Sequence, residues 1–325
     1  MTDVRAFFTA ATVPGEPEPW NTLQLKVYYP SAFGDSFDER NMGFIPAAKP
    51  QKPYPVVLFM PGSNCHPEVY GWLAKGLCEL GLVCITFSWI KEDMPGFVSL
   101  SPGFDLRYLT PDSFGKAPSC SSLPTLLQAV DNLNNEGLLA GLLDTNKVIL
   151  GGHSAGGNAV LLNSNREWFP QLVGGFSYAA HTGASTQIGF PEDTLLPVSG
   201  NVPMLIMGGE QDGVIAASAN RYGDREDSTP TERIGRTFDE ALNSDRGDSH
   251  LLLVRGANHF CFAHPYDGSP GRPFLDWPAK ASEDELRGLM LDTIKTFIQA
   301  CVGRGEHSAL STLADNPHVS RYACK

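Results

Sequence analysis

The sequence contains few positive charges and no long hydrophobic run. Its 24 Lys and Arg residues are outnumbered by 36 Asp and Glu residues, which gives a formal net charge of −12 at pH 7. This negative charge repels phosphate backbones and anionic lipid headgroups, so we expect no nucleic-acid partner and no stable membrane insertion. No stretch approaches the roughly 18 consecutive apolar residues of a membrane-spanning helix. We therefore expect a soluble globular protein.

Cysteine motifs and targeting signals are also missing. The seven cysteines are odd in number and scattered, without CxxC spacing, which favours free thiols over a disulfide framework. The N-terminus carries an acid at Asp3 and only a short apolar run before Pro14, unlike a secretory signal. No Asn-x-Ser/Thr sequon occurs. These absences predict a cytoplasmic location, and no pattern in the chain indicates a metal or nucleotide site.

Apolar segments alternate between strand and helix character along most of the chain. Residues 55–60 and 82–87 are continuous apolar runs, as in strands covered by helices on both faces. Residues 67–80 between them have helical spacing, and Gly81 can end that helix in the left-handed conformation. Further helices are expected near 119–138, from about 155 and from 282, and further strands at 147–151, 173–178, 203–207 and 250–254. The alternation predicts a single α/β domain over residues 1–325, with a mostly parallel central sheet and helices on both faces.

Several segments lie outside this alternation. Residues 23–29 alternate with period two, which predicts a half-exposed edge strand and the start of a core that extends to about residue 300. Residues 89–118 form a long loop rich in aromatic side chains, which we expect to cover a pocket rather than only pack on the surface. Residues 221–248 lack the spacing of a calcium loop and are expected to be a solvated excursion. Residues 302–325 are expected to form a C-terminal tail, after a last helix that begins with a capping box of Ser282 and Glu285.

The most informative motif is Gly152-His153-Ser154-Ala155-Gly156. It joins a buried strand to a helix rich in small residues, the context in which G-x-S-x-G forms a nucleophile elbow. The sharp turn requires a strained central residue and close backbone approaches, which the glycines permit. Ser154 is therefore the candidate nucleophile, and the alternative is a glycine-rich turn with an idle serine.

A serine nucleophile needs a base and an acid that orients the base. Asp212 follows the expected strand 203–207, and His259 follows the expected strand 250–254, so both belong to loops at the carboxyl edge of the sheet. Glu210 lies nearer its strand and is the alternative acid. Ser154, Asp212 and His259 are the predicted catalytic residues.

An oxyanion site and a substrate pocket should accompany these residues. Two backbone N–H groups normally bind the oxyanion, one directly after the nucleophile and one from the loop after an earlier strand. We expect Ala155 to supply the first and Ser63 or Asn64 the second. The predicted pocket residues are Trp89, Ile90, Met94, Phe97, His181 and Phe260.

The segments G-H-S-A-G-G, G-G-E-Q-D-G-V and G-A-N-H-F resemble the Ser-His-Asp esterases of the α/β-hydrolase superfamily over about residues 23–300. Within that branch the chain looks like the chlorophyllase, dienelactone hydrolase and polyester hydrolase group. The resemblance implies the α/β-hydrolase fold and cofactor-free cleavage of a hydrophobic small-molecule carboxylic ester. Alternatives are chlorophyllase-type cleavage of a large hydrophobic ester, amide or peptide hydrolysis by the same triad, and a catalytically silent ligand-binding protein.

Overall fold

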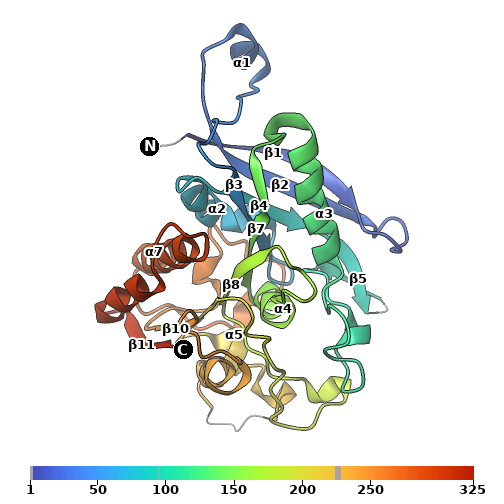
Figure 1. Ribbon diagram of the computed structural model, residues 1–325. Coiled ribbons are helices and arrows are strands. Elements are labelled where there is room, and N and C mark those ends of the chain that lie inside the picture. Colours follow the sequence, from blue (N-terminus) through green and yellow to red (C-terminus); the bar gives the residue numbers. More distant parts are fainter. Residues whose placement is uncertain (1–2, 95, 224–227) are drawn as a thin grey trace.

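A nine-stranded sheet forms the centre of the computed structural model, which describes residues 3–94, 96–223 and 228–325 (Figure 1). The strand order is β1-β2-β4-β3-β7-β8-β9-β10-β11. Neighbouring strands from β4 to β10 pair in parallel, whereas β1, β2 and β11 pair antiparallel with their neighbours. The strands are β1 (Asp3–Thr12), β2 (Thr22–Ser31), β3 (Tyr54–Met60), β4 (Val83–Ser88), β7 (Leu143–His153), β8 (Leu172–Tyr178), β9 (Met204–Gly209), β10 (His250–Val254) and β11 (Val319–Cys324). The predicted α/β class with a mostly parallel sheet is confirmed.

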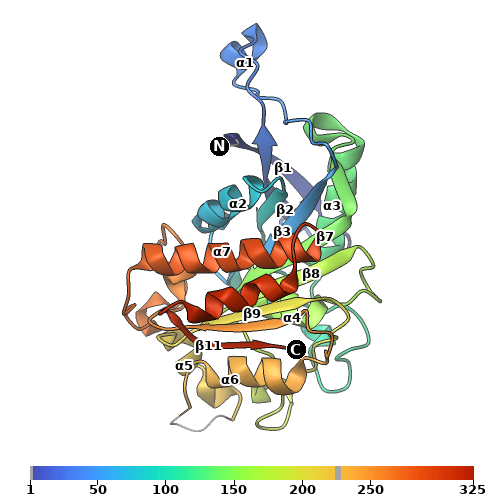
Figure 2. The ribbon, with the colours of Figure 1, turned by 60° about the vertical axis from the view of Figure 1, so that its left-hand side comes forward.

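Helices cover both faces of this sheet, as Figure 2 shows for α7 on the near side. Strand β3 illustrates why its sequence is apolar throughout. Val56 and Leu58 pack with α3 and α4, whereas Val57 and Phe59 pack with α2 and α7 on the opposite face. The helices are α1 (Phe37–Met42), α2 (Gly71–Cys78), α3 (Ser122–Asn135), α4 (Ala155–Asn163), α5 (Gly213–Ala216), α6 (Glu232–Arg236) and α7 (Glu283–Cys301). The predicted left-handed conformation of Gly81, after the helical segment 67–80, is confirmed, because Gly81 has φ +73°.

The two ends of the chain differ from the predictions. Residues 23–29 belong to β2, which lies inside the sheet, and β1 forms the edge in its place. The expected tail 302–325 instead contains a 3-10 helix (His307–Asp315) and β11, which pairs with β10. Most side chains of β1 are exposed and only one of β11 is fully buried, so neither strand shows the continuous apolar run of the central strands.

Two internal segments are more ordered than expected. Within the expected loop 89–118, β5 (Ile90–Met94) and β6 (Phe97–Leu100) pair as a two-stranded antiparallel sheet. Within the expected excursion 221–248, Ile234, Phe238 and Leu242 are buried in the core, which corrects the solvated interpretation for α6 and the turn after it. Residues 224–227 belong to this segment, which lacks the spacing of a calcium loop, and they lie outside the described residues.

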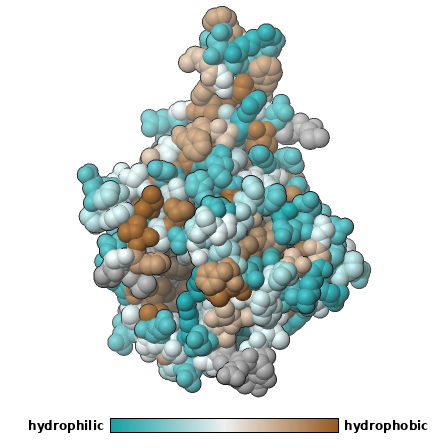
Figure 3. Space-filling view, turned by 180° about the vertical axis from the view of Figure 1, so that it is seen from behind, coloured by the Kyte–Doolittle hydropathy of each residue, from teal (hydrophilic) through white to brown (hydrophobic). Residues whose placement is uncertain are grey.

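The predicted capping box is wrong, because the Ser282 side chain makes no capping hydrogen bond. A complete capping box occurs instead at Ser36 and Glu39, where α1 begins. Helix α1 lies on a projection at the top of Figures 1 and 2, and Figure 3 shows hydrophobic and hydrophilic residues mixed on it. No helix in the described ranges is long and apolar enough to span a lipid bilayer.

Candidate active site

Ser154 occupies a sharp turn between β7 and α4. Its backbone has φ +54° and ψ −122°, a conformation that non-glycine residues rarely adopt. The turn is tight because the start of α4 lies against the end of β3. A Cβ atom on Gly156 would come 2.0 Å from the Met60 carbonyl oxygen, and one on Gly152 would come 2.4 Å from the Gly156 carbonyl oxygen. Only glycine fits at these two positions, which explains the motif.

Ser154, His259 and Asp212 form one hydrogen-bonded chain. His259 Nδ1 lies 2.8 Å from Asp212 Oδ2, and His259 Nε2 lies 2.9 Å from Ser154 Oγ. Since a carboxylate only accepts, Nδ1 carries the imidazole proton, and Nε2 is free to accept the serine hydroxyl proton. Asp212 is fully buried and His259 is 3% exposed, whereas Ser154 is partly exposed. The alternative acid Glu210 makes no hydrogen bond with His259 among the described residues.

Asp212 has a second structural contact. Its Oδ1 accepts a hydrogen bond from the Ile215 N–H at 2.8 Å and so caps the short helix α5. One carboxylate oxygen therefore fixes the side chain to its own loop while the other holds His259. This fixes the orientation of the imidazole toward Ser154.

Asp276, which the sequence gave no reason to select, joins the acid loop to the base loop. Its Oδ1 accepts from the Gly213 N–H at 3.0 Å and from the His259 N–H at 3.2 Å, and its Oδ2 accepts from the Phe260 N–H at 3.0 Å. Burial raises the pKa of Asp276, and the N–H groups of Phe260 and His259 act in the opposite direction. One carboxylate thus connects the residue after Asp212 with His259 itself.

A second buried hydrogen-bond network, centred on His153, connects the segments around the site. His153 Nε2 lies 3.0 Å from the His259 carbonyl oxygen, so Nε2 donates and Nδ1 accepts from the Tyr70 hydroxyl at 2.9 Å. Tyr70 in turn accepts the Gly62 N–H at 3.0 Å. Burial, and then the nearby His259, places the pKa of His153 well below 6.5, which keeps the ring neutral as this pattern requires. The network links the loop after β3, the elbow and the base loop.

The loop after β3 limits the choice of oxyanion donors. The Asn64 N–H donates to the Leu100 carbonyl at 2.9 Å and the Gly62 N–H donates to Tyr70, so both are occupied. The Ser63 N–H has no acceptor among the described residues. Ala155 is the first residue of α4, where an N–H lacks an intrahelical acceptor. Of the two predicted donors in this loop, the geometry therefore favours Ser63 over Asn64.

Ser154 and His259 open into a cavity of about 860 Å³. Three of the six predicted pocket residues line it, namely Phe97, His181 and Phe260. Trp89 does not line this cavity, because it is fully buried in the core and its indole N–H donates to the Trp20 carbonyl. Ile90 is exposed outside it, and the side chain of Met94 lies outside the described set. The expected cover 89–118 contributes Phe97, Ser99 and Phe104.

Burial, and then the charge of Arg233, lowers the pKa of His181 to about 3, so this wall residue is neutral at pH 7. Its ring packs edge-on against Tyr222 with the centroids 4.6 Å apart. The cavity is also lined by residues that the sequence did not single out: Arg221, Tyr222, Arg272 and Phe274. No local motif marks them, because they come from segments that meet only in the folded chain.

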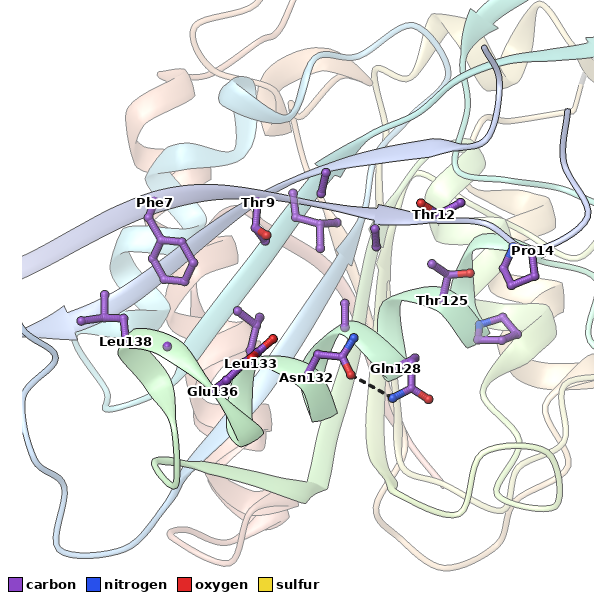
Figure 4. A pocket seen from close by; sticks show the side chains of 16 residues that line it. Phe7, Thr9, Thr12, Pro14, Thr125, Gln128, Asn132, Leu133, Glu136 and Leu138 are labelled. Atoms are coloured by element: carbon purple, nitrogen blue, oxygen red, sulfur yellow. Dashed lines mark hydrogen bonds between the residues drawn. The ribbon is translucent and has the colours of Figure 1, made fainter. Parts of the chain in front are cut away.

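A second cavity of about 810 Å³ lies between β1 and α3 (Figure 4). Threonines and amides such as Thr9, Gln128 and Asn132 line it together with apolar side chains such as Phe7 and Leu133. It contains no histidine or cysteine, and its lining includes neither Ser154 nor His259. Across the described part of the chain, no three His, Cys, Asp or Glu side chains are grouped to hold a metal ion.

No known family model matches this chain, and no curated protein is significantly similar to it.

Proposed function

We propose that this chain is a serine hydrolase with the α/β-hydrolase fold, and that it cleaves carboxylic esters through Ser154, His259 and Asp212. The observation that carries the proposal is the hydrogen-bonded chain of these three side chains at a strained turn that opens into a cavity. The Ser154 hydroxyl can act as a nucleophile, because His259 Nε2 lies 2.9 Å from its oxygen and can take its proton.

The reaction follows from the positions of the atoms. Ser154 Oγ attacks the ester carbonyl carbon while His259 Nε2 takes the hydroxyl proton, and Asp212 stabilises the resulting imidazolium. The N–H groups of Ala155 and Ser63 bind the oxygen that becomes negative. His259 then protonates the departing alkoxide and leaves the acyl group on Ser154. Water attacks the acyl-enzyme by the same route and restores the serine hydroxyl.

Three features support the α/β-hydrolase fold. The nucleophile, acid and base follow β7, β9 and β10 in chain order, as in that fold. The nucleophile lies on a strand-to-helix turn, and the loop after β3 lies beside it. The phenylalanines that line the cavity favour an ester with an apolar group.

The test compares wild type, Ser154→Ala and a matched control, Ser308→Ala, which removes an exposed serine on the C-terminal 3-10 helix. The substrates are 4-nitrophenyl acetate, butyrate and octanoate, together with butyranilide as an amide. We expect ester turnover in wild type and control, slower anilide cleavage, and a loss of at least about a thousandfold in kcat for Ser154→Ala. Wild-type turnover by Ser154→Ala would contradict the mechanism. Ligand binding without turnover by folded wild type would favour the silent binding protein.

A further inference from the structure

Two arginines line the cavity that contains Ser154 and His259. Arg221 ends a 3-10 turn after α5, and Arg272 follows Gly271 on a different segment. Gly271 lies close to the candidate oxyanion loop, since a Cβ atom there would be 3.9 Å from the Ser63 carbonyl oxygen. Two separate segments therefore bring positive charge to the cavity of the proposed nucleophile.

Neither of these two guanidinium groups pairs with a carboxylate among the described residues. Two nearby arginines do have a carboxylate partner. Arg233 Nη2 lies 3.5 Å from Asp193 Oδ1, and Arg236 Nη1 lies 2.5 Å from the same oxygen. The charges of the cavity arginines also act on each other. Burial, and then the charge of Arg221, lowers the pKa of Arg272. Arg221 is half-buried and Arg272 is exposed, so both guanidinium groups can reach a ligand that enters the cavity, and no carboxylate among the described residues neutralises either of them.

The described residues that line this cavity include no Asp or Glu side chain. Tyr222 lines the cavity with Arg221 and Arg272, and the guanidinium carbon of Arg233 lies 5.4 Å from the centroid of its ring. Burial raises the pKa of Tyr222, and the three arginines act in the opposite direction. The phenol is neutral at pH 7, as is His181 beside it. Elsewhere in the cavity Phe97, Phe104 and Phe274 supply apolar surface. The cavity is thus both apolar and cationic, although the chain carries a net charge of −12.

We propose that the substrate is an ester that carries a carboxylate a few methylene groups from the scissile bond, and that Arg221 and Arg272 bind this carboxylate. The inference rests on the proposed ester hydrolysis at Ser154. Guanidinium groups suit the role because their planar donors match the two oxygens of a carboxylate. The phenylalanines would hold the methylene chain between the two polar ends.

The test uses pairs of esters that differ in one charge. Monomethyl and dimethyl esters of succinate, adipate and suberate place the charge on the acyl side, and acetate esters of ω-hydroxy acids, with their methyl esters, place it on the alcohol side. Measuring kcat/KM for each pair gives a ratio of anionic to neutral ester, with the dimethyl values halved for their two identical groups. We expect the ratio to exceed one for at least one chain length and to fall as ionic strength rises.

Variants assign the preference to the arginines. Arg221→Gln or Arg272→Gln should lower the ratio by about tenfold, and the double variant should lower it further, because each removes a charge-assisted hydrogen bond. Lys52→Gln is the charge-matched control. Lys52 is exposed and precedes β3 at the amino end of that strand, away from Ser154, so its ratio should equal that of wild type.

A separate binding measurement distinguishes failure of the anion site from failure of the proposed function. Adipate is titrated calorimetrically into wild type and the double arginine variant at low salt, and we expect the Kd to rise at least about tenfold in the variant. Hydrolysis of both members of every pair with a ratio that the arginine variants leave unchanged would overturn the anion site alone. Adipate binding that needs the arginines, without hydrolysis of any ester, would overturn the ester-hydrolase proposal alone. Neither hydrolysis nor adipate binding would overturn both.

Discussion

At the residue scale, the backbone of the elbow depends on glycines that have no room for a side chain. Gly156 is the clearest case, because an added Cβ would overlap the Met60 carbonyl group, which is backbone and cannot rotate away. The strained φ of Ser154 persists only while these neighbours hold it.

We therefore predict that Gly156→Ala lowers the free energy of unfolding by about 3 kcal/mol or more and abolishes ester turnover. The control is Gly288→Ala on the exposed side of α7, where an added Cβ meets nothing within 4 Å. This change should raise stability by about 0.5–1 kcal/mol because alanine favours the helix. Urea unfolding and ester kinetics measure both effects. Equal stability of the two variants would show that the elbow is not so tightly packed.

A second prediction at this scale concerns the hydroxyl of Tyr70, which accepts from Gly62 and donates to His153. Tyr70→Phe leaves a buried imidazole nitrogen and a buried N–H without partners, and should cost about 1–3 kcal/mol of stability. It should also lower kcat more than it changes KM, because the loop after β3, which holds the proposed oxyanion donor Ser63, loses its connection to the loop of His259.

Tyr54→Phe provides the comparison. It removes one hydrogen bond, to the Ala48 carbonyl, at the amino end of β3. We expect a loss of stability with kcat unchanged. If Tyr70→Phe retained the wild-type kcat, the hydrogen bonds of Tyr70 would contribute to stability alone.

At the element scale, the loops after β9 and β10 need a fixed separation, and Asp276 supplies the link. Asp276→Asn keeps one acceptor oxygen but replaces the other with a donor that faces an N–H group. We predict a fall in kcat of about 10–100-fold with a smaller change in KM, because the mutation moves His259 relative to Ser154.

Asp267→Asn is the control for that change, since Asp267 is an exposed carboxylate whose Oδ1 accepts the Ser269 N–H. Its kcat should match wild type. Asp276→Glu tests for partial rescue by a carboxylate. If Asp276→Asn retained full kcat, Asp276 would not be a positioning residue.

The pairing of β10 with β11 encloses a stacked group of His250, His307 and Tyr322. His250 Nδ1 lies 3.0 Å from the Tyr322 hydroxyl, and His250 Nε2 lies 3.3 Å from His307 Nδ1. Burial, and then His307, lowers the pKa of His250 from 6.5 to about 4, while Asp248 acts in the opposite direction. The unfolded chain therefore binds a proton here at a higher pH than the folded chain does.

This difference predicts full stability from His250 above pH 6.5 and a progressive loss as the pH falls from 6.5 to about 4. Urea midpoints at pH 7.5 and 5.0 measure the effect. The His250→Phe variant keeps an aromatic ring but cannot gain a proton, so its midpoint should change less between the two pH values. A pH dependence as steep as that of wild type would contradict this assignment.

The elements also show where sequence patterns are informative. Strands β3, β4 and β7–β10 could be predicted because helices cover both of their faces, which produces continuous apolar runs. Strand β1 could not, because most of its side chains are exposed, although Phe7 and Ala11 pack against the core. Strand β11 also lacks a continuous apolar run, although it covers the edge of β10.

At the scale of the whole molecule, the site combines residues that a local pattern marks with residues that no local pattern marks. Ser154 could be selected from its glycine motif, and Asp212 and His259 could be selected because each lies in a loop that follows a recognisable strand. Asp276 and Tyr70 could not, because they reach the site from segments that tertiary packing alone places there. Likewise, the Asn64 N–H donates to the Leu100 carbonyl because β6 lies against the loop after β3, and no local pattern predicts this contact.

Charge is also distributed unevenly over the molecule. The acidic surplus of the whole chain predicts weak attraction for anions, whereas the cavity beside Ser154 contains two arginines without carboxylate partners in the described ranges. Net charge governs encounters at long range, and the local arrangement of charges governs binding once a ligand has entered.

The measurement that tests the central claim most directly is the intact mass of the protein after incubation with a small neutral fluorophosphonate. It reports an activated serine without any knowledge of the substrate. We predict a single adduct on wild type and none on Ser154→Ala or His259→Ala, with all three proteins folded by circular dichroism. An unmodified wild type, or an adduct that persists on Ser154→Ala, would contradict the assignment of Ser154 as the nucleophile.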